Sequence, residues 1–186
     1  MNGATLLARF VAALNDRDIP YMVVGSFSSN YHGVPRSTKD ADIVLEFDNE
    51  AWSKFSQNLP EGMALDPQGG FEMVTATRKE VIYTEGSLFE IEVFHLSDDE
   101  FDQERFRRRI EVDLGQGVST WIASAEDAVV QKLRWLAGAR RSKDFDDVVK
   151  VLFKQGNDLD FEYIESWCAK HGSLEILAEA RETADQ

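Results

Sequence analysis

The stretch that decides the fold, "YMVVGSFSSNYHGVPRSTKDADIVLEF", covers residues 21–47. An apolar run ends at Gly25-Ser26, thirteen mostly polar residues follow, and the chain then reaches "DADIVLEF". Its alternation predicts a strand, and because side chains alternate along a strand, Asp40 and Asp42 lie on one face. Folding does not require two like charges at the start of a strand, so the pair raises the question of its chemistry.

A cation would explain the aspartate pair, because two neighbouring carboxylates repel unless one is protonated or a cation lies between them. Mg²⁺ prefers such oxygen ligands and is usually held by one or two carboxylates plus substrate phosphates. A solvated strand start is the other interpretation of an isolated Asp-x-Asp. Gly25-Ser26 favours the metal, since glycine lets the backbone approach a ligand and the N–H groups of a helix start bind anions. An anion cradle beside a cation site is what a nucleoside triphosphate with Mg²⁺ needs.

Composition and charge limit the classes of protein to which the chain can belong. The chain has 186 residues, 43% of them apolar, and a net charge of −14. Its single cysteine, Cys168, excludes an intramolecular disulfide and a thiolate metal cluster within one chain. No stretch approaches the roughly 20 apolar residues of a membrane span, so we expect a soluble cytoplasmic protein. The acidic excess disfavours extended nucleic acid as a partner, whereas basic clusters at 105–109 and 132–143 remain compatible with a small anionic ligand.

Periodicity predicts a mixed first part and a helical second part. Residues 1–122 are expected to form an α/β domain, and residues 123–186 a helical region packed on it. Ser26, Ser97 and Ser124 are predicted helix N-caps. The predicted helices of the first part cover 4–16, 27–32, 49–60 and 97–109, and its strands cover 20–25, 41–47, 71–76, 80–84 and 88–95, with a hairpin around Gly115 and Gly117.

The motifs resemble a known superfamily. Gly25-Ser26, a spacer, Asp40-Ala41-Asp42 and a later acidic residue within a strand resemble the nucleotidyltransferase superfamily of the DNA polymerase β type. The resemblance implies an α+β fold, in which a nucleotidyltransferase-like mixed β-sheet is flanked by helices and followed by a C-terminal helical subdomain.

Two further segments resemble small bacterial minimal nucleotidyltransferases and AbiEii-like toxins. The first is "VPRSTKDAD", which contains Arg36 and Thr38. The second is "SAEDAVVQKLRWL…RRSKDFDDVVKVL", in which Lys132 and Asp147 match helical positions that those proteins share. With these segments the resemblance covers about residues 20–155.

The resemblance implies an enzyme, a Mg²⁺-dependent nucleotidyltransferase that moves a nucleoside monophosphate from a triphosphate to an acceptor hydroxyl. The acceptor could be a small molecule, an RNA end or a protein. Two magnesium ions are expected in the active complex, held by Asp40, Asp42 and a third carboxylate. We choose Glu92 as the third, because it precedes the short apolar run Val93-Phe94, and Glu90 on the same strand face is its rival.

Other residues are weaker candidates. Nucleotide-binding residues implied by the resemblance are Gly25, Ser26, Arg36 and Lys132, and Lys39, Thr38 and Asp147 are further candidates. A loop cation or a helix lysine is often simply solvated, and a surface aspartate needs no explanation. Asp147 is interpreted as a residue that could orient Lys132 or a basic neighbour.

Two alternatives to the enzyme stay open. One is a non-catalytic nucleotide- or protein-binding module with the same fold, favoured by a third carboxylate that is glutamate and therefore one methylene longer than aspartate. The other is the toxin component of a toxin–antitoxin pair, with an antitoxin protein as partner. The sequence does not decide the acceptor, the nucleotide or the oligomeric state.

Overall fold

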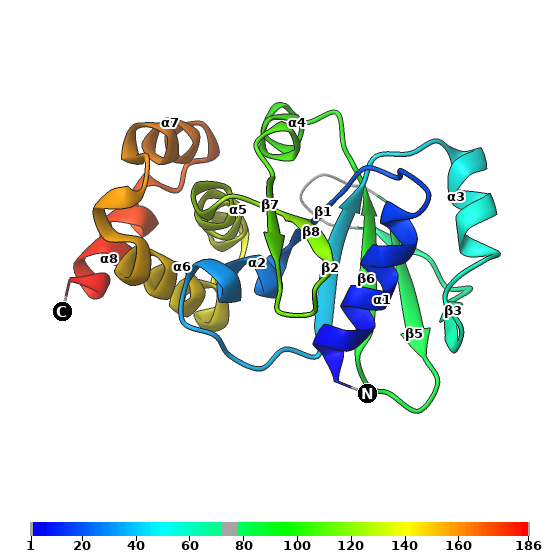
Figure 1. Ribbon diagram of the computed structural model, residues 1–186. Coiled ribbons are helices and arrows are strands. Elements are labelled where there is room, and N and C mark those ends of the chain that lie inside the picture. The colour runs from blue at the N-terminus through cyan, green and yellow to red at the C-terminus, as the bar shows by residue number, and fades with distance from the viewer. Residues whose placement is uncertain (1, 72–77, 186) are drawn as a thin grey trace. The chain divides into compact units, whose positions relative to one another are not determined.

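A computed structural model of the chain describes residues 2–71 and 78–185 (Figure 1). Its helices are α1 (Gly3–Asn15), α2 (Gly25–His32), α3 (Asn49–Ser56), α4 (Glu100–Arg107), α5 (Ala125–Gly138), α6 (Ser142–Gln155), α7 (Phe161–His171) and α8 (Leu174–Ala184), with a 3₁₀ turn η1 (Gly156–Asp158). Its strands are β1 (Tyr21–Val24), β2 (Asp40–Leu45), β3 (Met63–Leu65), β4 (Gly70–Phe71), β5 (Arg78–Thr84), β6 (Glu90–His95), β7 (Ile110–Asp113) and β8 (Ser119–Ile122). None of these helices is long and apolar enough to cross a bilayer, a finding limited to the described residues.

The described strands form one mixed sheet in the order β3-β5-β6-β2-β1-β8-β7, with β4 paired to β5. Two pairs are parallel, β2 with β6 and β1 with β8, and the remaining pairs are antiparallel. The predicted α+β class with a mixed sheet is therefore confirmed. β3 was not predicted, because three residues are too few to show alternation. The strand predicted over 71–76 lies outside the described residues except for Phe71.

The chain divides into two compact units. The first comprises Met1–Val24 and Thr38–Ile122, and the second comprises Gly25–Ser37 and Ala123–Gln186. Helix α2 therefore belongs with the C-terminal helices, although it lies between β1 and β2 in the sequence. The division into domains at residues 122 and 123 stays a prediction.

Helix α1 covers the apolar face of the sheet in the first unit. It lies across the sheet and contacts β2 and β8 (Figure 1). Its predicted apolar stripe is buried in full, and Phe10 meets Phe55 of α3 with ring centroids 5.5 Å apart. Full burial of such a side chain contributes about 1.5–3 kcal/mol relative to exposure. The stripe is Leu6, Leu7, Phe10, Val11 and Leu14.

Helix α5 is the centre of the second unit, since it contacts α2, α6, α7 and α8. Its side chains Val129, Val130, Leu133 and Leu136 are at most 3% exposed, as their helical spacing predicts. Ser124 caps the helix as predicted, and its Oγ accepts the Asp127 N–H at 3.1 Å.

Two of the predicted caps are wrong. Ser26 lies inside α2 rather than before it, because Gly25 has a φ of 60° and this left-handed conformation turns the chain from β1 directly into the helix. The cap of α4 is Asp99 and not Ser97. A carboxylate at this position accepts the N–H groups of Phe101 and Asp102, both at 3.1 Å.

Close packing at Gly33 predicts a loss of stability in Gly33→Ala. A Cβ at Gly33 would lie 3.0 Å from the Ser29 carbonyl oxygen and 3.1 Å from backbone atoms of Lys150 and Val151. Since backbone cannot move aside cheaply, we expect the free energy of unfolding in urea to fall by about 1–3 kcal/mol. Gly138→Ala is the matched control, because its Cβ would meet nothing within 4 Å. Equal unfolding midpoints for the two variants would contradict the packing described.

Candidate active site

Four carboxylates lie on one face of two adjacent strands. In the parallel pair β2–β6, Asp40 is the register partner of Glu90 and Asp42 is the partner of Glu92. Register partners point to the same face and lie about 4.8 Å apart. The face therefore brings both candidate third carboxylates beside the aspartate pair, each next to a different aspartate.

Burial of the opposite face holds this register. Ala41, Ile43, Ile91 and Val93 alternate with the carboxylates and are at most 1% exposed. A slip of one residue would move the carboxylates into the core, so the register is strongly specified. The aspartates and Glu92 are half-buried, and Glu90 is exposed.

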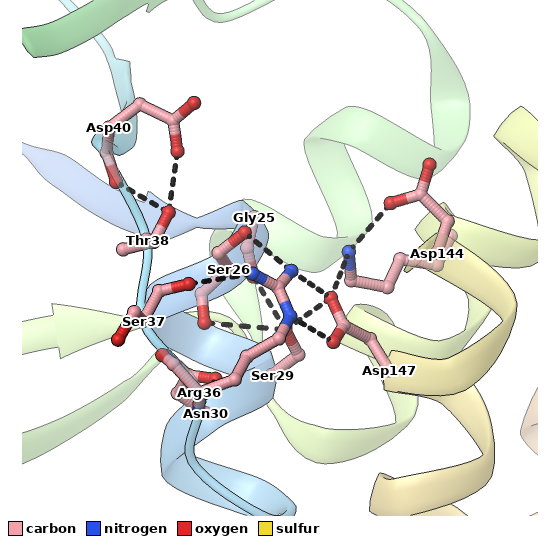
Figure 2. A network of polar contacts seen from close by, with 11 residues as sticks. Gly25, Ser26, Ser29, Asn30, Arg36, Ser37, Thr38, Asp40, Asp144 and Asp147 are labelled. Carbon is pink, nitrogen blue, oxygen red and sulfur yellow. Dashed lines mark hydrogen bonds and ion pairs between the residues drawn. The ribbon is translucent and has the colours of Figure 1, made fainter. Parts of the chain in front are cut away.

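Two of the carboxylates have identified partners in the first unit. The Thr38 hydroxyl donates to Asp40 Oδ1 at 2.6 Å, as Figure 2 shows. The Lys79 ammonium donates to Glu92 Oε1 at 2.6 Å. Lys79 was not predicted from the sequence, because only the register of β5 against β6 brings it near Glu92.

The candidate carboxylates have the ligand atoms that magnesium prefers, but their present contacts do not form a metal site. Asp40, Asp42 and Glu92 supply the hard oxygen donors that Mg²⁺ prefers, on neighbouring positions of one sheet face. Among the described residues, however, no group of three or more His, Cys, Asp and Glu side chains is arranged to hold a metal ion. The ion pair of Glu92 with Lys79 is one contact that a metal would have to replace.

A second polar group lies in the second unit, around the turn at Gly25. The Arg36 guanidinium donates to both carboxylate oxygens of Asp147, at 2.6 and 2.5 Å (Figure 2). It also donates to the Ser26 hydroxyl at 3.0 Å. Ser29 Oγ is 3.2 Å from the carbonyl of Gly25. These bonds tie the loop after α2 to α6 and to the first turn of α2.

Lys132 belongs to the same network. Its ammonium is 3.0 Å from Asp144 Oδ1 and 3.0 Å from Asp147 Oδ2, and its side chain is only 4% exposed. The two cations predicted to contact a nucleotide, Arg36 and Lys132, thus share one carboxylate partner, Asp147. Lys39, a weaker candidate, is exposed. Asp144 was missed, because its pairing depends on the packing of α5 against α6.

The network changes the acidity of Asp147. Burial by itself would raise the pKa of this carboxyl, but the hydrogen bond from Arg36 and the charge of Lys132 outweigh burial and lower it. The carboxylate therefore stabilises the folded state above its unfolded pKa of about 3.9. That stabilisation is lost as the pH falls through the lower folded pKa.

The fold is shared with solved structures of nucleotidyltransferases. The chain aligns with the solution structure of the antibiotic-resistance factor ANT(2'')-Ia at 15% identity, covering 96% of both chains with a TM-score of 0.63. It aligns with the crystal structure of ANT(2'')-Ia in complex with adenylyl-2''-tobramycin at 16% identity, covering 91% of this chain and 97% of the other with a TM-score of 0.60. At these identities the likeness establishes a nucleotidyltransferase-like fold.

The chain also aligns with the crystal structure of an antigenic nucleotidyltransferase-like protein from Paracoccidioides brasiliensis. It is 15% identical, and the alignment covers 97% of this chain and 92% of that protein with a TM-score of 0.56. No protein-family model and no curated protein sequence matches the chain significantly.

Asp147→Asn should destabilise the protein, because Arg36 and Lys132 both lose the buried carboxylate with which they pair. We expect the free energy of unfolding at pH 7 to fall by about 3 kcal/mol. The wild type should lose stability as the pH drops below about 4, and the variant should lose less over that range because the titrating carboxyl is gone. Denaturant unfolding between pH 3 and pH 7 measures both. Asp146→Asn, an exposed neighbour on the same helix, is the control and should keep the wild-type profile.

Proposed function

We propose that the chain is a nucleotidyltransferase that transfers a nucleoside monophosphate from a triphosphate to an acceptor hydroxyl. The observation that supports this most is the register of β2 and β6. It aligns Asp40 and Asp42 with Glu90 and Glu92 on one face of a nucleotidyltransferase-like sheet. Cations bound on that face would offset the repulsion between these neighbouring carboxylates.

Asp40, Asp42 and Glu92 are proposed to hold magnesium in the complex with the triphosphate. When bound, magnesium would offset the charge of the triphosphate and lower the pKa of the acceptor hydroxyl. Thr38 would keep the carboxylate of Asp40 in a fixed orientation through the 2.6 Å hydrogen bond.

The proposed transfer is an in-line substitution at phosphorus. The acceptor oxygen forms a bond to the α-phosphorus, while the bond from that phosphorus to the oxygen of the β-phosphate breaks and pyrophosphate leaves. Glu92 would either accept the hydroxyl proton or help to hold the magnesium that acidifies it.

The phosphates are proposed to contact Ser26 and backbone N–H groups at the start of α2. Arg36 donates to the Ser26 hydroxyl, so it would position this serine even if it does not itself bind phosphate. A direct phosphate contact by Arg36 or Lys132 would require exchange with the carboxylate of Asp147.

The acceptor is proposed to be a small molecule. The net charge of −14 disfavours an RNA end, since nucleic acid contacts usually need basic surface. One structure with the same fold was solved with adenylyl-2''-tobramycin. The resemblance to AbiEii-like toxins adds the proposal of an antitoxin partner, for which growth arrest on expression would be the signature.

A second candidate is a non-catalytic module that binds a nucleotide or a protein with the same fold. The ion pair of Lys79 with Glu92 favours it, because this contact already neutralises the candidate third carboxylate.

Activity should depend on Asp42 and Glu92. Incubation with labelled triphosphates, Mg²⁺ and a panel of hydroxyl acceptors should release pyrophosphate and label an acceptor. We expect Asp42→Asn and Glu92→Gln each to lower kcat/KM by about a hundredfold or more, because each removes an oxygen charge that acts in the transition state.

Glu90→Gln is the matched control for the third carboxylate and should change kcat/KM by only a few fold. The opposite ranking of the two glutamate variants would assign the role to Glu90. Full activity of Asp42→Asn would refute the proposed mechanism.

Triphosphate binding should require Mg²⁺, because cations must offset the repulsion between the phosphates and the aspartate pair. We expect calorimetry with a non-hydrolysable triphosphate to give an affinity at least about tenfold weaker in EDTA than in Mg²⁺. Asp40→Asn should remove this dependence. Failure to bind any triphosphate with or without Mg²⁺ would favour the protein-binding module instead.

A further inference from the structure

Lys79 stands diagonally next to the third carboxylate on the sheet face. In the antiparallel pair β5–β6, Lys79 is the register partner of Phe94, and Glu92 is the partner of Val81. Diagonal neighbours on one face lie about 7–8 Å apart, which a long side chain can span. The ammonium reaches Glu92 Oε1 at 2.6 Å, and the two side chains are 29% and 21% exposed. The contact therefore follows from the sheet register and is not a chance meeting of two mobile surface chains.

The row that contains Glu92 crosses four strands. Val81, Glu92, Asp42 and Val24 are register partners on β5, β6, β2 and β1. Glu92 thus has Asp42 on one side and an apolar residue on the other. Its ion pair is formed with Lys79, which reaches it diagonally.

A metal ion bound by Glu92 would lie close to this ammonium, which holds Oε1 of the same carboxylate. Mg²⁺ binds carboxylate oxygen at about 2.0–2.1 Å, and a second cation within hydrogen-bond distance of that oxygen repels it. The pair is partly buried, so solvent screens this repulsion less than at an open surface. Either Lys79 leaves Glu92 or the metal binds weakly.

We propose that Lys79 is a positioning residue that acts as a built-in counter-ion of the third carboxylate and keeps Glu92 out of the metal set until substrate binds. This inference rests on the proposed function. Lys79 does not react in it. The ammonium neutralises Glu92 in the free protein and makes binding of a divalent cation alone weak. The triphosphate then supplies further oxygen ligands for the metal, so that metal and nucleotide bind together.

Binding of Mn²⁺ without nucleotide tests the inference, with electron paramagnetic resonance reporting free Mn²⁺. We expect Lys79→Met to bind Mn²⁺ about tenfold more tightly than the wild type, because one positive charge next to a ligand oxygen is removed. Lys79→Gln removes the same charge with a polar side chain, so it should show the same gain and exclude an effect of the apolar methionine. The gain should disappear in Lys79→Met combined with Glu92→Gln.

Lys54→Met is the matched control, since it also removes one lysine of an ion pair. Lys54 pairs with Glu50 on α3 and its side chain is 75% exposed. If both Lys79 variants bind Mn²⁺ no more tightly than Lys54→Met does, the proposed role of Lys79 is overturned. The proposed metal site itself is retained in that case, provided that Asp42→Asn still weakens Mn²⁺ binding. Absence of Mn²⁺ binding in every variant would overturn the proposed metal site as well.

Discussion

Parallel pairing of β2 with β6 places six successive residues of each strand side by side, and the arrangement of the first unit depends on it. On one face of the pair, Ala41, Ile43, Leu45, Ile91 and Val93 are at most 1% exposed, so the register is held by the core and not by the charges. The carboxylates on the other face are brought together at the expense of their mutual repulsion. Core packing therefore supplies the energy that keeps like charges adjacent.

The two units compensate charge in different ways. In the second unit, Arg36 and Lys132 share the carboxylate of Asp147, and Lys132 also pairs with Asp144, in a largely buried network with two charges of each sign. Breaking one member leaves an uncompensated buried charge, so the network acts as a structural tie. On the sheet face of the first unit the carboxylates are more exposed, and their partners can exchange at lower cost.

This difference bears on how the protein would work. A buried, balanced network holds the loop that follows α2 and keeps the Ser26 hydroxyl in place. The carboxylate face has a hydroxyl donor at Asp40 and an ammonium at Glu92, both of which leave oxygen lone pairs for another ligand. In the first unit, contacts that can exchange are compatible with the proposed binding of a metal ion. If the contacts of Thr38 with Asp40 and of Lys79 with Glu92 did not exchange for a metal, the protein would be a binding module instead.

Local periodicity was enough to predict a mixed first part and a helical second part, the buried stripe of α1, the Ser124 cap and the aspartates on one face, because each depends on neighbours a few residues apart. The α+β class with a nucleotidyltransferase-like sheet was implied by the resemblance of the motifs. The Ser26 cap was predicted wrongly, since the left-handed conformation of Gly25 lets the helix begin two residues earlier than predicted. Tertiary structure alone decided that Glu92 is the register partner of Asp42, that Lys79 reaches it diagonally and that α2 belongs with the C-terminal helices. These contacts join segments far apart in the chain, and they are set by strand register and helix packing, on which no local pattern carries information.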